Sequence, residues 1–129
     1  MKKLILIVLS LLLLSACGGG NENVQEAVYV NITAQQAKKI MDEQKNYIIL
    51  DTRTQEEYDT GHIPGAILIP YDEIREKAEK ILTDKHQLIL VYCRSGRRSK
   101  LAAQDLVKLG YTNIKEFGGI LDWPYGVEQ

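Results

Sequence analysis

The sequence is poor in cysteine and has little net charge. Only two of its 129 residues are cysteines, and the formal net charge is −1. Without the first sixteen residues, which hold two lysines, 14 basic residues stand against 17 acidic ones, a net charge of −3. This mild acidity argues against nucleic acid as a partner, and no basic patch is present to bind anionic lipid. Internal repeats are absent, as is a second linker, which leaves room for one small domain.

The one long apolar run stands at the start of the chain and is too short to span a membrane. Lys2 and Lys3 precede residues 4–14, an apolar stretch interrupted only by Ser10. At about 1.5 Å per residue it covers roughly 16 Å, about half of a bilayer core. We therefore interpret it as the hydrophobic region of a signal peptide.

The boundary Leu14-Ser15-Ala16-Cys17 resembles the lipobox of bacterial lipoproteins. That resemblance implies a signal peptide over residues 1–16 and a lipidated Cys17, so that the protein is exported and anchored to a bacterial membrane with its domain outside the cytoplasm. The alternative is an ordinary signal peptide cleaved after Ala16, which leaves Cys17 free. Residues 17–27 then form the N-terminus and a polar, glycine-rich tether. If Cys17 carries lipid, Cys93 is the only thiol left, and an unpaired cysteine in an exported protein is more often reactive than structural.

Residues 28–129 alternate between short apolar runs and helical patterns. The runs predict strands at 28–30, 47–50, 66–69, 88–92 and 114–117. Because these runs do not alternate with polar residues, both faces of each strand are expected to be buried, as in a parallel sheet covered by helices. The sequence therefore predicts an α/β domain with a mostly parallel sheet of about five strands.

Capping patterns mark where the helices begin. Thr33 with Gln36 and Thr54 with Glu57 form capping boxes, each opening a helix. Asp72 is expected to cap a third helix, whose apolar face is Ile74, Ala78 and Ile81. A fourth helix is expected over residues 100–109, with Gly110 as its C-cap.

The segment that follows the central strand carries the chemistry. Residues 93–99 read Cys-Arg-Ser-Gly-Arg-Arg-Ser, between the strand at 88–92 and a helix. A strand that runs into a loop and then a helix places the loop at the carboxyl edge of the sheet, where backbone N–H groups and the helix dipole converge. We interpret Cys93 as a nucleophile above an anion cradle whose members are Arg94, Ser95, Gly96, Arg97, Arg98 and Ser99.

Ionisation of this thiol would not need a base. A free cysteine titrates near pH ~8.5, and loop amides together with nearby arginines favour the thiolate. Neither histidine lies near Cys93 in the sequence. Sulfite can leave from thiosulfate without a proton, whereas an amine leaving group cannot, so sulfur transfer through a persulfide suits this loop. No metal or cofactor is predicted.

Phosphoryl chemistry is the main competitor, because the same cradle suits a phosphate. Cysteine phosphatases use Cys-x5-Arg, and counting from Cys93 places Ser99 where that arginine would stand. Arg98 comes one residue early, so the loop holds six residues and favours a small sulfur anion. Phosphatase or arsenate reductase activity is therefore the less favoured alternative.

Four motifs in order resemble the single-domain rhodaneses, which are thiosulfate-type sulfurtransferases. They are residues 49–53 with 56–58, residues 61–66 (Gly-His-Ile-Pro-Gly-Ala), the loop 93–99, and Gly118-Gly119-Ile120 with Trp123. The resemblance covers essentially all of residues 28–129 and implies the rhodanese-like three-layer fold. It also implies that Cys93 carries a persulfide, taking sulfur from a donor such as thiosulfate and passing it to cyanide, a thiol or a protein acceptor.

Several residues admit a plainer interpretation. Asp51 and Arg53 are expected to support the site through an ion pair or backbone contacts rather than touch the substrate. Cys93 itself could be an inert buried thiol. The domain could also serve as a non-catalytic sulfur-relay or partner-binding module, in which the cysteine is kept but thiosulfate is not turned over.

The lipid anchor generates the first prediction. We expect mass spectrometry of the membrane fraction to find Cys17 acylated at the mature N-terminus, because the lipobox-like segment places the cysteine directly after Ala16. A soluble product that begins at an unmodified Cys17 would refute this interpretation.

Overall fold

The computed structural model describes residues 28–129. The predicted signal peptide, the lipidation site Cys17 and the tether over residues 17–27 lie outside the described residues. Within residues 28–129, no helix has the length and apolar character needed to cross a bilayer.

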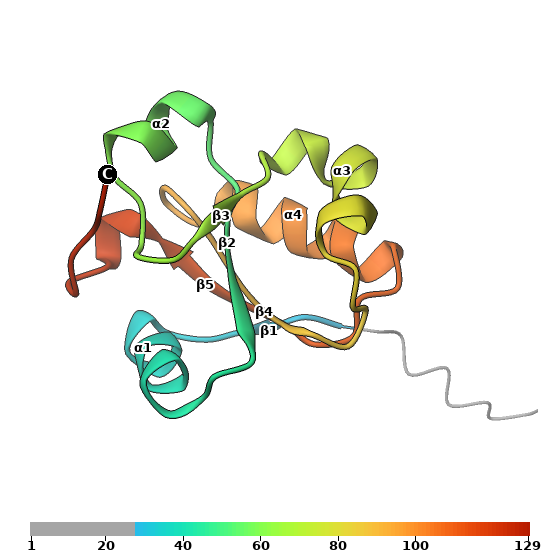
Figure 1. Ribbon diagram of the computed structural model, residues 1–129, viewed down its shortest axis with the longest axis horizontal. Coiled ribbons are helices and arrows are strands. Elements are labelled where there is room, and N and C mark those ends of the chain that lie inside the picture. Colours follow the sequence, from blue (N-terminus) through green and yellow to red (C-terminus); the bar gives the residue numbers. More distant parts are fainter. Residues whose placement is uncertain (1–27) are drawn as a thin grey trace, which may run out of the picture.

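Five strands form one parallel sheet in the order β1-β5-β4-β2-β3 (Figure 1). The sheet confirms the predicted α/β class. Its central strand, β4, is buried along its whole length, which explains why its residues are apolar without alternation. The strands are β1 (Val30–Asn31), β2 (Tyr47–Asp51), β3 (Ile67–Leu68), β4 (Leu88–Cys93) and β5 (Ile114–Gly119).

Helices cover both faces of the sheet and complete three layers. Figure 1 shows α1 on one side of the sheet, with α3 and α4 on the other. The α-helices are α1 (Ala34–Glu43), α2 (Gln55–Thr60), α3 (Ile74–Ile81) and α4 (Arg97–Lys108), and two 3-10 turns are η1 (Tyr71–Glu73) and η2 (Ile120–Asp122).

Two hydrophobic cores follow from this layering. Successive side chains of a strand point to opposite faces, so neighbouring residues of β4 serve different cores. Ile89 and Val91 pack with the residues of α3 and α4, whereas Leu90 and Tyr92 pack on the side of α1. The sheet is therefore held from both sides, and its carboxyl edge is fixed in place.

Three of the four predicted helix caps are present. Both capping boxes, at Thr33 and Thr54, have the reciprocal bonds between side chain and backbone. At the end of α4, Gly110 has a φ of +94°, which favours glycine. The Gly110 N–H donates to the Val107 carbonyl and the Tyr111 N–H to the Leu106 carbonyl, which is the Schellman arrangement.

The prediction for α3 was wrong in two details. Asp72 does not cap the helix; it lies inside the 3-10 turn η1, and Glu73 stands at the N-cap without a side-chain bond. The chain enters the helix through this turn because the Glu73 N–H donates to the Pro70 carbonyl. Ile81 is 48% exposed, and the next residue, Leu82, is 1% exposed and takes the buried place.

Helix α4 begins at Arg97, three residues earlier than predicted. Gly96 stands at its N-cap with a φ of +111°, a conformation that turns the chain sharply from loop into helix. Arg97, Arg98 and Ser99 therefore belong to the first helical turn. The free N–H groups of that turn are thereby brought close to the end of β4.

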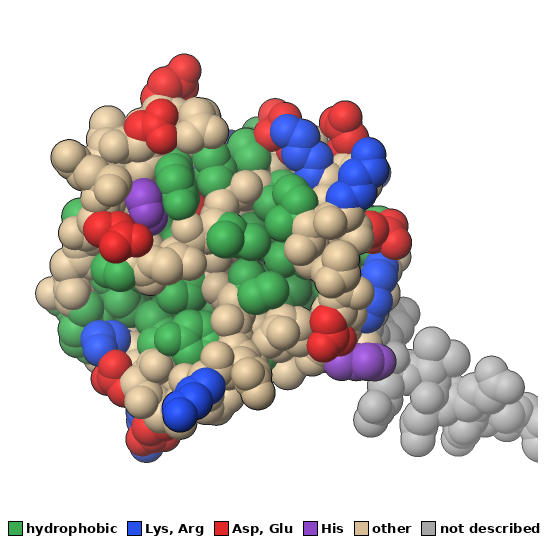
Figure 2. All heavy atoms as spheres, viewed as in Figure 1, with side chains coloured by type: hydrophobic (Ala, Val, Ile, Leu, Met, Phe, Trp, Pro, Cys, Tyr) green, Lys and Arg blue, Asp and Glu red, His purple; other side chains and the backbone are tan. Residues whose placement is uncertain are grey.

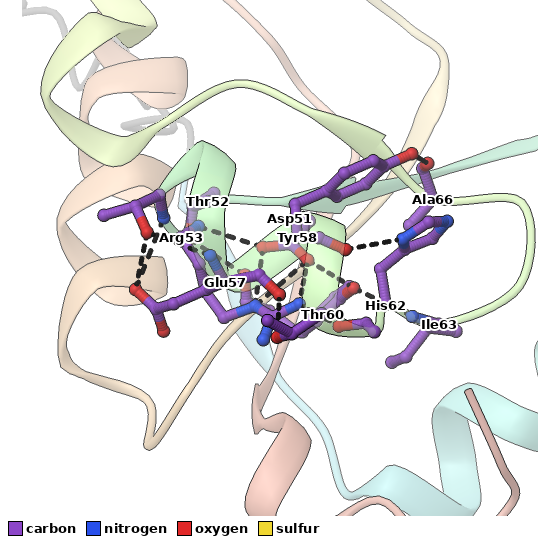
Figure 3. A network of polar contacts seen from close by, with 12 residues as sticks. Asp51, Thr52, Arg53, Glu57, Tyr58, Thr60, His62, Ile63 and Ala66 are labelled. Atoms are coloured by element: carbon purple, nitrogen blue, oxygen red, sulfur yellow. Dashed lines mark hydrogen bonds and ion pairs between the residues drawn. The ribbon is translucent and has the colours of Figure 1, made fainter. Parts of the chain in front are cut away.

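A buried polar network joins the ends of β2 and β4 (Figure 3). Asp51 accepts bonds from the Arg53 backbone N–H at 2.9 Å and from its guanidinium at 2.8 to 3.1 Å. The Tyr92 hydroxyl donates to Asp51 at 2.6 Å and accepts from the Ile63 N–H at 3.1 Å. Burial raises the pKa of the Tyr92 hydroxyl, as does the neighbouring Asp51, so the hydroxyl keeps the proton it donates. Arg53 also donates to the Gly61 carbonyl at 2.7 Å.

This network predicts a large difference between two arginine substitutions. Arg53→Ala leaves the fully buried Asp51 carboxylate without its counter-charge, so we expect a loss of about 3–5 kcal/mol in the free energy of unfolding. Arg75→Ala removes a guanidinium that is 69% exposed beside Asp105, and it should cost about 1 kcal/mol or less. Urea denaturation of both variants measures the difference, and equal losses would contradict it.

Candidate active site

Cys93 is the last residue of β4 and lies where the pairing with β5 becomes irregular. The register shifts between Val91 and Cys93, and Cys93 pairs with Gly119. Its Sγ atom faces the following loop, where the Gly96 N–H donates to it at 3.0 Å and the Ser99 Oγ lies 3.3 Å away, a contact in which either atom can be the donor. The residue is only 1% exposed, so access to the sulfur runs through the loop itself.

Hydrogen-bond donors around the sulfur favour the thiolate. Burial raises the pKa of the Cys93 thiol, but hydrogen bonds from the Ser99 hydroxyl, when its proton points at Sγ, and from the backbone N–H groups of Ser99, Gly96 and Ser95 together lower it by more. The net effect is a pKa below the ordinary value. An inert buried thiol would have an apolar pocket and a raised pKa instead, so these surroundings favour a reactive cysteine.

Close packing of the loop against the start of η2 fixes its shape. A Cβ atom built on Gly119 would lie 1.9 Å from the Arg94 carbonyl oxygen and 2.5 Å from the Ser95 nitrogen, so only glycine fits there. The Arg94 carbonyl also accepts a bond from the Leu121 N–H at 3.2 Å. These two contacts fix the backbone of the loop directly after Cys93.

The three arginines of the predicted cradle occupy different positions. Arg94 and Arg97 are exposed, and Arg97 lies 5.9 Å over the ring of Tyr71. Arg98 instead forms two bonds to Glu57 of α2, at 2.6 and 2.9 Å. Arg94 and Arg97 are therefore free to meet an anion, whereas the Arg98 side chain ties α2 to the first turn of α4.

Glu116 is the residue at this site that the sequence interpretation missed. It is 2% exposed, and its Oε1 accepts from the Ser99 hydroxyl at 2.7 Å and from the Gly118 N–H at 2.8 Å. The sequence did contain a signal for its burial. Residues two apart in a strand share a face, so Glu116 lies on the same buried face of β5 as Ile114. Ser99, included in the predicted cradle, is fully buried between this carboxylate and Cys93.

The other residues of the family-like motifs make their contacts away from the Cys93 sulfur. Asp51 and Arg53 bind each other, Tyr92 and Gly61, and among the described residues neither has a hydrogen bond to Cys93. His62 stacks on Tyr58 with ring centroids 3.8 Å apart, and its Nδ1 lies 2.9 Å from the Tyr58 carbonyl. Trp123 packs on Phe117 and lines a hollow of about 290 Å³, and no residue of the cysteine loop lines that hollow.

A family model for the rhodanese-like domain matches residues 33–124, which is most of the chain. The chain belongs to the rhodanese-like domain family. Thiosulfate sulfurtransferase PspE of Escherichia coli is 38% identical over 73 residues, which are 57% of this chain and 70% of that protein. The putative sulfur carrier protein YrkF of Bacillus subtilis is 33% identical over 107 residues, 82% of this chain and 57% of that protein.

A solved structure, described as a rhodanese with anions from E. coli, superimposes with a TM-score of 0.60 and 34% identity. The match covers 64% of this chain and 98% of the other. The fold of this chain is thus a known rhodanese-like fold.

The Glu57–Arg98 ion pair of this rhodanese-like domain should make stability depend on pH. The hydrogen bond and charge of Arg98, together with hydrogen bonds from Thr54, outweigh burial and lower the pKa of Glu57 from 4.5 to about 2. A pKa that is depressed in the folded state adds stability above the unfolded value, and this stability is lost as the pH falls through the folded value. We therefore expect Glu57→Gln to reduce the free energy of unfolding at pH 7, with a difference from the parent protein that shrinks from about pH 4.5 and vanishes near pH 2.

Denaturant unfolding across pH 2 to 7 measures this difference. Glutamine preserves the capping box of α2, so the substitution removes the charge while the cap remains. Glu56→Gln is the matched control, because Glu56 is the exposed neighbour, and it should change stability by less than about 0.5 kcal/mol at any pH. A difference for Glu57→Gln that does not vary with pH would show that the ion pair is not its source.

Proposed function

We propose that the protein is a sulfurtransferase that takes sulfane sulfur from a donor such as thiosulfate onto Cys93 and passes it to cyanide or a thiol. The observation that carries this proposal is the ring of N–H groups around a cysteine whose pKa is lowered. These donors are fixed by the turn at Gly96 and by the packing against Gly119. They can hold a thiolate, and then the anionic outer sulfur of a persulfide, without rearrangement.

The reaction needs neither an external oxidant nor a general acid. The Cys93 thiolate attacks the outer sulfur of thiosulfate, a new S–S bond forms, and the bond to the sulfonyl sulfur breaks so that sulfite leaves with the electron pair. In the second step an acceptor nucleophile, cyanide or a thiolate, attacks the outer sulfur of the persulfide. Cys93 then leaves as the thiolate, which completes the cycle. Exposed Arg94 and Arg97 supply positive charge where the anionic donor enters.

Phosphatase or arsenate reductase chemistry fits the geometry less well. The position of a phosphatase clamp arginine is occupied by Ser99, which is fully buried and bonded to the carboxylate of Glu116. The arginine one residue earlier, Arg98, is engaged by Glu57. The position at which a phosphatase would bind the phosphate oxygens therefore carries no guanidinium, and that of Arg98 is bound to Glu57.

A sulfur carrier that exchanges with other proteins is the second candidate. Its support is the similarity to the putative sulfur carrier protein YrkF. On the face shown in Figure 2, acidic and basic side chains lie interspersed around the rim, with hydrophobic side chains toward the middle. Such a mixed surface suits a protein partner better than a polyanion such as nucleic acid.

We further propose that the domain works outside the cytoplasm, held at a bacterial membrane through a lipid on Cys17. The support is the signal-peptide pattern of residues 1–16 and the lipobox-like boundary. A polar tether over residues 18–27 would keep the domain clear of the membrane surface.

Intact mass spectrometry with thiosulfate tests the sulfurtransferase proposal. We expect a gain of about 32 Da, the mass of one sulfur atom, which peptide mapping places on Cys93, together with thiocyanate formation when cyanide is added. Cys93→Ser should lose both signals, because a hydroxyl does not form a persulfide. Cys17→Ser serves as the control and should still load sulfur on Cys93.

Turnover retained in Cys93→Ser would overturn the proposal. If Cys93 loads from another persulfidated protein but not from thiosulfate, the carrier function is favoured. Hydrolysis of an aryl phosphate would favour phosphatase activity instead, and reduction of arsenate would favour arsenate reductase activity.

A further inference from the structure

The Ser99 hydroxyl has more acceptors around it than protons to give. Its Oγ lies 2.7 Å from Glu116 Oε1, 3.0 Å from the Gly96 carbonyl, 3.3 Å from Cys93 Sγ and 3.4 Å from the Gly118 carbonyl. A serine hydroxyl donates one proton and accepts through two lone pairs. Ser99 can therefore stabilise a thiolate on Cys93 only if its proton is not committed elsewhere.

The carboxylate of Glu116 is the strongest competitor for that proton. It offers the shortest of the four distances, and hydrogen bonds to ionised acceptors are roughly twice as strong as neutral ones. With the proton on the Glu116 side, the lone pairs of Ser99 Oγ are left for Cys93. In that arrangement Ser99 accepts a bond from an S–H group and supports the thiol, not the thiolate.

Charge acts in the same direction as the hydrogen bond. Glu116 is 2% exposed, and its nearest cation is the Lys100 ammonium, 3.6 Å from Oε2 and itself 48% exposed. The Ser99 hydroxyl thus contacts both Cys93 Sγ and a buried carboxylate that Lys100 only partly neutralises. A negative charge on Cys93 would be repelled by that carboxylate. The other charged groups near the loop are paired or exposed: Arg98 with Glu57, Asp51 with Arg53, and the exposed Arg94 and Arg97.

We propose that Glu116 is a positioning residue that holds the Ser99 proton away from Cys93, and so favours both the resting thiol and the sulfur-loaded state over the free thiolate. In the loaded state Sγ is bonded to sulfur and the negative charge moves to the outer atom, away from Glu116 and toward the loop N–H groups. The penalty that Glu116 imposes on the empty thiolate is then relieved. The second half of this inference rests on the proposed sulfur transfer, whereas the first half does not.

Alkylation of Cys93 by iodoacetamide as a function of pH tests the first half without any sulfur chemistry. Glu116→Gln removes the charge and keeps the shape. The midpoint of its alkylation profile should fall by about one pH unit, which corresponds to a roughly tenfold faster reaction at a pH below both midpoints. Glu43→Gln, an exposed glutamate at the end of α1, is the matched control and should leave the midpoint unchanged. A midpoint that stays or rises in Glu116→Gln overturns the proposal.

Ser99→Ala separates this role from a merely structural one. With Glu116 present, the substitution should leave the midpoint unchanged or lower it, because the hydroxyl proton is committed to the carboxylate and the oxygen supports the thiol form of Cys93. In the Glu116→Gln background it should raise the midpoint clearly, because Ser99 is then free to donate to Sγ. An equal rise in both backgrounds would mean that Ser99 serves Cys93 regardless of Glu116. If Glu116→Gln fails to fold, a clear rise in Ser99→Ala alone overturns the proposal, and an unchanged or lower midpoint supports it.

The loading equilibrium tests the second half. At a fixed ratio of thiosulfate to sulfite, and at a pH above both alkylation midpoints where the empty site is a thiolate, intact mass should show a smaller persulfide fraction in Glu116→Gln than in the parent protein. An equal or larger fraction contradicts the sulfur-retention role. Failure of both proteins to load at all would count against the proposed function, while the alkylation profiles would still decide the role of Glu116.

Discussion

The buried Asp51 carboxylate is the group on which the rest of the carboxyl edge depends. It binds the Arg53 guanidinium and the Tyr92 hydroxyl, and through them it holds the turn at Gly61 and the Ile63 backbone against the sheet. A charge taken out of water must be paired and fully hydrogen-bonded, and here every bond that satisfies Asp51 or Arg53 also fixes a segment of chain. The pair therefore contributes geometry to the site, although it does not touch the sulfur.

From this network the constraint passes to the cysteine loop through α2. Arg53 precedes the Thr54 cap, and the capping box places Glu57 on the first turn of the helix. Glu57 then binds Arg98 in the first turn of α4, the turn whose N–H groups begin the cradle. On the opposite side, the loop rests on Gly119, where a side chain of any size would overlap it. The cradle is thus clamped between two elements, each fixed by a contact that allows little variation.

Much of this was visible in the sequence, and the exceptions have physical causes. Continuous apolar runs located the central strands correctly, and the capping boxes marked two helix starts by chemistry rather than by composition. The expected burial of every strand was wrong for β1, which begins at Val30 and is exposed because it lies at the edge of the sheet. The start of α4 was missed because Gly96 permits a sharp entry that places charged residues in the first turn, which periodicity alone does not reveal. Leu82 is buried in place of Ile81, which the helical pattern predicted to be buried, because the side chain that is buried at a helix end depends on how the chain leaves the helix. Glu116 was missed because the strand pattern indicates only that its side chain is buried, whereas its role at the site depends on its partner Ser99 on another element.

The site contains two kinds of hydrogen-bond donor, backbone N–H groups whose direction is fixed and a hydroxyl that can rotate toward another acceptor. Backbone N–H groups of the loop point at the sulfur because the turn and the packing at Gly119 allow no other direction, so they stabilise any negative charge that arises there. The Ser99 hydroxyl can rotate, and its preference is set by a carboxylate that lies deeper than the sulfur. The fixed N–H groups stabilise a negative charge on either sulfur of the loaded site. The Ser99 hydroxyl, whose proton is drawn to Glu116, makes a charge on the outer sulfur more favourable than a charge on Cys93 Sγ. The Glu116 carboxylate would weaken a site that only binds anions. In sulfur transfer it is compatible with the site, because the negative charge must move from Cys93 Sγ to the outer sulfur during each cycle.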